Sequence, residues 1–136
     1  MKRLLIAAVL SLATILVLGA VAVASARGQA SPTPGRQTVA APIDDIQVLI
    51  RESSPPQVTL KVKAGLPSGC AQRDSHSLNR VGATITVTVL NTIPTGNPIC
   101  TMIYGTYELN IDLGRDFSPG ATYTVRVNEK TTTFKT

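Results

Sequence analysis

Five segments of the chain alternate apolar and polar residues with a period of two. In one of them Ile85, Val87 and Val89 alternate with threonines. This pattern is typical of strands that bury one face and leave the other in water. The five segments span residues 46–51, 58–63, 84–89, 107–113 and 122–127.

Two weaker segments, Ser77–Val81 and Thr131–Lys135, complete a set of seven short strands. We also expect Ile99–Tyr104 to extend the strand before Tyr107, with Gly105 as a bulge. Pro- and Gly-rich turns separate the strands, and Asn128-Glu129 predicts a tight hairpin. No segment of the folded part has a sustained helical period. The pattern predicts an all-β, immunoglobulin-like sandwich of two antiparallel sheets.

Tyr123 opens the strand that follows the Pro-Gly turn of "SPGATYTVRV". A tyrosine at this place is typical of the tyrosine corner of Greek-key sandwiches, whose hydroxyl bonds back to the backbone. The alternative is an ordinary half-buried tyrosine.

The N-terminus has the three parts of a secretory signal peptide. A basic pair at residues 2–3 precedes an apolar stretch over residues 4–23, and Ala24-Ser25-Ala26 fits the cleavage rule. We therefore expect a signal helix over residues 1–26, export to the cell envelope or the medium, and cleavage after Ala26. The apolar stretch is also long enough to remain as a membrane anchor.

The composition changes after the cleavage site. Residues 27–42 are rich in Pro, Gly, Ser, Gln and Ala and have no apolar period, which predicts a flexible linker. The β-sandwich domain is then expected to span residues 43–136.

The positive charge of the chain is not a nucleic-acid signal. The net charge is +5, but four of the 13 basic residues precede residue 43, which leaves nine basic against eight acidic residues in the expected domain. These basic residues are scattered among acids, whereas phosphate binding needs clustered cations. We expect no nucleic-acid partner.

The chain has two cysteines, so Cys70–Cys100 is the one disulfide it can form. An exported chain meets an oxidising environment, where an even cysteine count favours a disulfide. A free nucleophilic thiol or a metal-binding pair is the alternative.

Four stretches of the chain look familiar: "ESSPPQVTLKVKAGLPSGC", "TITVTVLN", "CTMIYGTYELNIDLG" and "FSPGATYTVRVN". They resemble a group of small exported bacterial proteins that carry one β-domain behind a signal peptide. The resemblance covers nearly all of residues 43–136 and implies the same fold and disulfide, but no activity, because such stretches specify a scaffold.

The rare reactive residues gather in "GLPSGCAQRDSHSLNR" without forming a catalytic pattern. Ser75 and Ser77 flank the only histidine, His76, but neighbours on a strand point to opposite faces and no nucleophile elbow is present. The acidic pairs Asp44-Asp45 and Asp112/Asp116 are too few for a metal site. We expect no enzyme, metal or cofactor.

Two binding functions remain. "NTIPTGNP" keeps Asn91, Pro94, Thr95 and Gly96 of the Asn-Pro-Thr-Thr-Gly loop of chagasin-type protease inhibitors, but in a broken order. The other function is a binding or structural module of the cell envelope, a monomer with an unknown protein or polymer as its partner. Loops at sandwich ends commonly make such contacts.

The candidate interaction loop of this module is Cys70–Ser77, with Gln72, Arg73 and Asp74 as its contact residues. The disulfide would hold it beside "NTIPTGNP". The alternative is that both loops are mere connections. Membrane contact is expected only through an uncleaved N-terminal segment.

Overall fold

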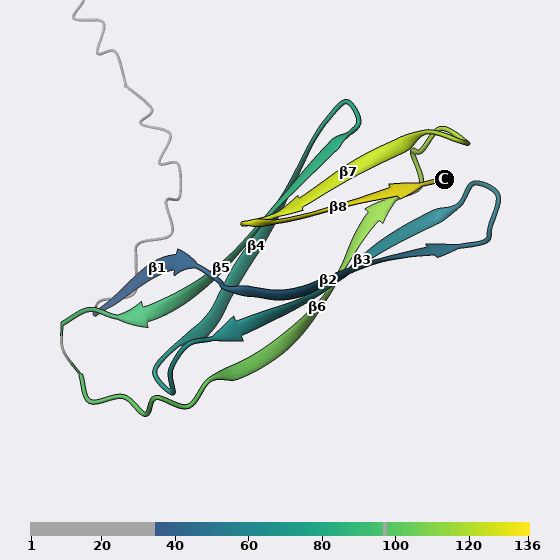
Figure 1. Ribbon diagram of the computed structural model, residues 1–136. Helices are drawn as coiled ribbons and strands as arrows, with labels where there is room; N and C mark the ends of the chain where they lie inside the picture. Colours follow the sequence, from purple (N-terminus) through teal and green to yellow (C-terminus); the bar gives the residue numbers. More distant parts are fainter. Residues whose placement is uncertain (1–34, 97) are drawn as a thin grey trace, which may run out of the picture. The chain divides into compact units, whose positions relative to one another are not determined.

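The computed structural model describes residues 35–96 and 98–136, which form eight strands (Figure 1). They are β1 (Arg36–Ala40), β2 (Ile43–Arg51), β3 (Gln57–Leu66), β4 (Gln72–Val81), β5 (Thr84–Pro94), β6 (Gly105–Gly114), β7 (Thr122–Val127) and β8 (Lys130–Lys135). This part of the chain contains no helix that could span a bilayer. The predicted signal helix and residues 27–34 of the predicted linker lie outside the described residues.

The strands form two sheets, which confirms the all-β, two-sheet prediction. One sheet contains β1, β4, β5, β7 and β8, and the other has the order β2-β3-β6. All five strongly alternating segments lie in strands. The apolar faces of four of them form most of the shared core between the sheets, whereas in β2 Ile46 and Val48 are partly buried and Ile50 is 40% exposed. The fully buried members are Val58, Leu60, Val62, Ala64, Val87, Val125 and Val127.

One pairing departs from the expected antiparallel arrangement. Residues 84–87 of β5 pair in parallel with residues 124–127 of β7. Between these two strands the chain crosses to the other sheet as β6, and such a crossover is what allows two strands of one sheet to run in the same direction. The five-plus-three arrangement of strands also differs from the four-plus-three of constant-type immunoglobulin domains.

Asn128, in the β7–β8 hairpin, joins three parts of the five-stranded sheet. The hairpin forms as predicted, with Val127 paired to Lys130, and Asn128 takes a left-handed φ of 47° that asparagine tolerates well. Its side-chain amide accepts a hydrogen bond from the Val89 N–H and donates to the carbonyls of Val89 and Ala41. β1 pairs with residues 90–94 of β5, and β7 pairs with residues 84–87 of the same strand. The Asn128 side chain lies between these two paired segments.

β1 corrects the predicted linker, because residues 36–40 are a strand paired with residues 90–94 of β5. Arg36 fastens this strand, with its guanidinium donating to the Thr92 hydroxyl at 3.0 Å and to the Cys70 carbonyl at 2.8 Å. The segment "RQTVA" has no apolar alternation of its own. Its structure depends on partners distant in sequence, which a local pattern does not reveal.

β4 is twice as long as its predicted strand and begins at Gln72 instead of Ser77. Nearly all of its side chains are exposed, because β4 pairs only with β5 and lies at the edge of its sheet. The strand therefore lacks apolar alternation. Its charged residues and the register irregularity between Arg73 and His76 are features that protect exposed strand edges from aggregation.

The expected strand extension over Ile99–Tyr104 is wrong, because β6 begins only at Gly105. Gly105 pairs with Leu66 at the end of β3, without a bulge. Residues 98–104 instead form part of the connection between the two sheets, and their large apolar side chains lie in solvent.

Tyr123 makes the hydrogen bond that defines a tyrosine corner. Its hydroxyl accepts the Ser118 backbone N–H at 2.8 Å, and this bond is the main reason that the pKa of Tyr123 lies below its ordinary value. The ring packs against Phe117 and Phe134, and Arg80 lies over Phe117 at 4.6 Å from the ring centroid. These contacts hold the connection between β6 and β7 against the domain.

The role of Arg36 in the fold can be tested by substitution. Arg36→Ala should lower the free energy of unfolding by about 1.5–3 kcal/mol, the typical value of hydrogen bonds from a charged group. Arg36→Lys keeps the charge but not the forked geometry and should recover only part of the loss. Urea unfolding measures both; if Arg36→Ala unfolds like the wild type, residues 36–40 do not stabilise the domain.

Candidate functional site

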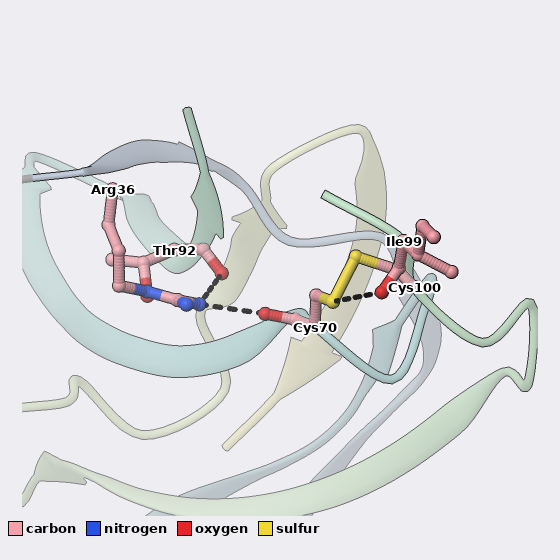
Figure 2. Close-up of a disulfide and its surroundings, with 5 residues drawn as sticks. All are labelled: Arg36, Cys70, Thr92, Ile99 and Cys100. Carbon is pink, nitrogen blue, oxygen red and sulfur yellow. Dashed lines mark hydrogen bonds between the residues drawn. A yellow bond between two sulfur atoms is a disulfide. The ribbon is translucent and has the colours of Figure 1, made fainter. Parts of the chain in front are cut away.

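The disulfide joins two connections that cross between the sheets at the same end of the domain. Cys70 and Cys100 are bonded, which confirms the predicted pair (Figure 2). Cys70 lies between β3 and β4, and Cys100 between β5 and β6. Arg36 approaches from β1 and donates to the Cys70 carbonyl, so three segments distant in sequence meet at this bond.

Residues 98–104, which we call the apolar loop, are fixed at several further points. The Thr101 carbonyl accepts the Gly69 N–H at 2.9 Å, and the Tyr104 hydroxyl donates to the Asp44 carboxylate at 2.7 Å. This bond to Asp44 is the main reason that the pKa of Tyr104 is raised, so the phenol stays neutral and remains a donor at physiological pH.

Two glycines make room for the apolar loop. A side chain at Gly65 would overlap the Tyr104 ring, and one at Gly69 would overlap the Thr101 hydroxyl. Both glycines belong to the "GLPSG" turn, which therefore does more than end a strand. It provides the surface on which the apolar loop rests.

The apolar loop presents three large apolar side chains to solvent. Ile99 is fully exposed, and Met102 and Ile103 are 86% and 72% exposed. Of the eight large apolar side chains that are exposed in the described residues, four lie between residues 99 and 104. Burying an isoleucine or methionine is worth about 1.5–3 kcal/mol, so exposing three together leaves a large free energy to be gained by contact. Such clustered exposure typically marks an interaction site.

Asn91 lies beneath the apolar loop and connects the two sheets. It is fully buried, and no other polar side chain in the described part of the chain is classed as buried. Its amide donates to the Gly65 carbonyl at 2.8 Å and accepts the Tyr107 hydroxyl at 2.6 Å. Burial raises the pKa of Tyr107, which keeps this donor protonated.

This placement does not favour the inhibitor interpretation of "NTIPTGNP". Residues 91–94 belong to β5, and the Asn91 side chain is used inside the domain. Two of the four residues that resemble the inhibitor loop, Asn91 and Pro94, are therefore strand residues, and Thr95 and Gly96 follow the end of β5.

The predicted interaction loop is a strand. Gln72, Arg73 and Asp74 are exposed as expected but lie at the start of β4. Arg73 lies 5.7 Å from the centroid of the Tyr107 ring, where its charge interacts with the ring face and partly offsets the burial that raises the pKa of Tyr107.

The reactive residues of β4 do not converge. Ser75 donates to the Asp74 carboxylate at 3.0 Å, while His76 and Ser77 pair across the strands with Val89 and Thr88. Among residues 35–96 and 98–136, no three histidine, cysteine, aspartate or glutamate side chains gather as a metal site would require.

A shallow hollow of about 50 Å³ lies on the outer face of the three-stranded sheet, lined by Asp45, Gln47, Lys61, Lys63 and Glu108. Lys61 and Glu108 form an exposed ion pair at 3.4 Å. Since these charges already interact with one another in solvent, the hollow resembles an ordinary charged sheet surface more than a ligand site.

Sequence reasoning missed the apolar loop because it counted Ile99, Met102 and Ile103 as strand residues. One signal could have found it: these residues do not follow a period of two, whereas the core strands β3, β5, β6 and β7 do.

The Asn91 bridge should contribute strongly to stability. Asn91→Ala leaves the Gly65 carbonyl and the Tyr107 hydroxyl unpaired and should cost about 2–4 kcal/mol, whereas Tyr107→Phe removes a single bond and should cost about 1 kcal/mol. Thermal and urea unfolding measure both changes. Equal costs for the two variants would show that Asn91 does not act as a two-sided bridge.

The disulfide joins residues that are 30 positions apart in the sequence, so it should stabilise the domain by restricting the unfolded chain. Replacing both cysteines by serine should lower the free energy of unfolding by about 3–4 kcal/mol, because the unfolded chain regains the entropy of the open loop. Urea unfolding of oxidised wild type and the double variant gives the difference. A loss below about 1 kcal/mol would contradict this role.

Comparison with known proteins identifies the domain but adds no activity. No match was found among curated proteins, and none among solved structures. The model of one family, the ORF11 beta-sandwich domain, matches residues 60–136, which is more than half of the chain and runs from β3 to the C-terminus. The chain therefore belongs to the ORF11 beta-sandwich domain family.

Proposed function

We propose that this protein is an exported, non-enzymatic binding module of the cell envelope or its surroundings, and that the apolar loop is its contact surface. The β-sandwich is the scaffold, and the immunoglobulin-like type is retained as an interpretation of its two-sheet core. Export is inferred from the signal-like N-terminus and is supported by the disulfide, which persists in oxidising compartments.

The observation that carries the proposal is the combination of anchoring and exposure in residues 98–104. Cys100, Thr101 and Tyr104 hold the loop to the domain, while Ile99, Met102 and Ile103 face solvent. A loop already held in one conformation loses little entropy when it binds. Apolar side chains on such a loop can serve as the central anchors of an interface.

The same residues argue against the alternative that the loop is a mere connection. A connection needs length and polarity, and it gains nothing from several attachments to the domain or from clustered apolar side chains. The proposal moves the contact surface from Gln72, Arg73 and Asp74, which follow Cys70, to the apolar loop around Cys100.

Substitution in the apolar loop tests the proposal. Met102→Ser combined with Ile103→Ser should weaken binding to isolated cell envelopes of the source organism by about tenfold or more, since interface anchors typically contribute at least 1–2 kcal/mol each. Co-sedimentation of the purified protein with the envelopes measures the affinity.

The matched control is Leu49→Ser combined with Val81→Ser, which removes two exposed apolar side chains elsewhere on the domain. This variant should bind like the wild type, and both variants should keep the wild-type urea midpoint. If the loop variant and the control bind equally well, the apolar loop is not the contact surface.

A further inference from the structure

We infer that the apolar loop docks on a phospholipid bilayer, with Ile99, Met102 and Ile103 entering the interfacial region. This inference deepens the proposed function and rests on it, because it names the partner of the same surface. It adds a membrane contact by the folded domain to the contact expected only from an uncleaved N-terminal segment.

The chemistry of the apolar loop suits a bilayer. Residues 98–104, "PICTMIY", contain no charged side chain, and the three exposed apolar residues project outward rather than line a cavity. Projecting apolar side chains can enter a soft apolar medium without a complementary pocket. Tyr104 lies at the foot of the loop, half exposed, with its hydroxyl on the Asp44 carboxylate. A tyrosine with an apolar ring and a polar end is typical of the membrane–water boundary.

While an uncleaved N-terminal segment lies in a bilayer, the path of the chain keeps this end of the domain near the membrane. The described chain begins at Gly35, whose carbonyl accepts the Thr95 N–H at 2.8 Å, and Arg36 pairs with Pro94. The chain thus enters the domain beside the start of the connection that carries the apolar loop, as Figure 1 shows for β1 and the end of β5. Any force that holds the preceding chain near a bilayer also holds this end of the domain near it.

The length of the chain before Gly35 limits the distance between this end of the domain and the bilayer. Eleven residues, 24–34, separate the apolar stretch 4–23 from Gly35, and even fully extended they reach no more than about 40 Å. While the apolar stretch lies in the bilayer, the loop is therefore confined close to the lipid surface. Such confinement gives the loop a high effective concentration at the lipid surface. Three apolar side chains can then be sufficient for binding to the bilayer.

The apolar loop itself carries no charged side chain, and the charged group bonded to it is the Asp44 carboxylate, which does not attract anionic lipid. Docking should therefore be apolar rather than electrostatic, and it should change little with ionic strength or with the fraction of anionic lipid.

A single tryptophan tests this inference, because the chain contains none. The full chain carrying Ile103→Trp is reconstituted into phosphatidylethanolamine–phosphatidylglycerol vesicles, and Val81→Trp provides a matched probe on an exposed apolar residue of β4. The expected result for Ile103→Trp is emission at shorter wavelength, quenching by lipids brominated on their acyl chains, and little quenching by aqueous iodide. Val81→Trp should show the emission and iodide quenching of an exposed tryptophan.

The outcomes separate this inference from the proposed function. If Ile103→Trp is as accessible to iodide as Val81→Trp and is not quenched by brominated lipids, the bilayer is not the partner. In that case, loss of envelope binding by the Met102 and Ile103 variant would still support a contact surface for a protein. Lipid quenching that disappears in 0.5 M salt would also overturn the inference, since it would show electrostatic rather than apolar docking.

Discussion

The bond between Cys70 and Cys100 is the constraint on which the end of the domain that carries the apolar loop depends. It joins the connection from β3 to β4 with the connection from β5 to β6, and both of these cross between the two sheets. Sheet crossings are the parts of a sandwich with the fewest backbone partners. One covalent link therefore fixes two of them at once, and Arg36 adds β1 to the same point.

Buried hydrogen bonds of Asn91 also hold the two sheets together inside the core. Asn91 holds β5 against β3 and β6, and Tyr107 completes the bridge close to where the apolar loop ends. The loop itself is attached to Cys70 by the disulfide, to Gly69 of the "GLPSG" turn and, through Asp44, to β2. This attachment explains how residues without regular secondary structure can expose Ile99, Met102 and Ile103 in one fixed arrangement. Preorganised exposure of this kind is the feature on which the proposed binding function depends.

Much of the fold was predictable because its core strands alternate. The buried faces of β3, β5, β6 and β7 follow the period of two, and the hairpin at Asn128 and the disulfide follow from local residues and cysteine count. β1 and the first half of β4 were not predictable in this way. Their side chains are mostly exposed, and hydrogen bonding to β5 holds them in place.

The location of the candidate site was predicted wrongly for a related reason. Ile99–Tyr104 was expected to extend the strand before Tyr107, and Gln72, Arg73 and Asp74 were expected in a loop held by the disulfide. The structure reverses both assignments. Exposed apolar residues break the rule that links hydrophobicity to burial, and such local violations are expected at functional sites.

The central claim is that the apolar loop is rigid although it is exposed and lacks regular structure. Backbone amide ¹⁵N relaxation of Thr101, Met102, Ile103 and Tyr104 tests it most directly. The account predicts order parameters close to the value of about 0.85 that is typical of rigid backbone. Values below about 0.6 would show a flexible loop and would contradict a preorganised contact surface.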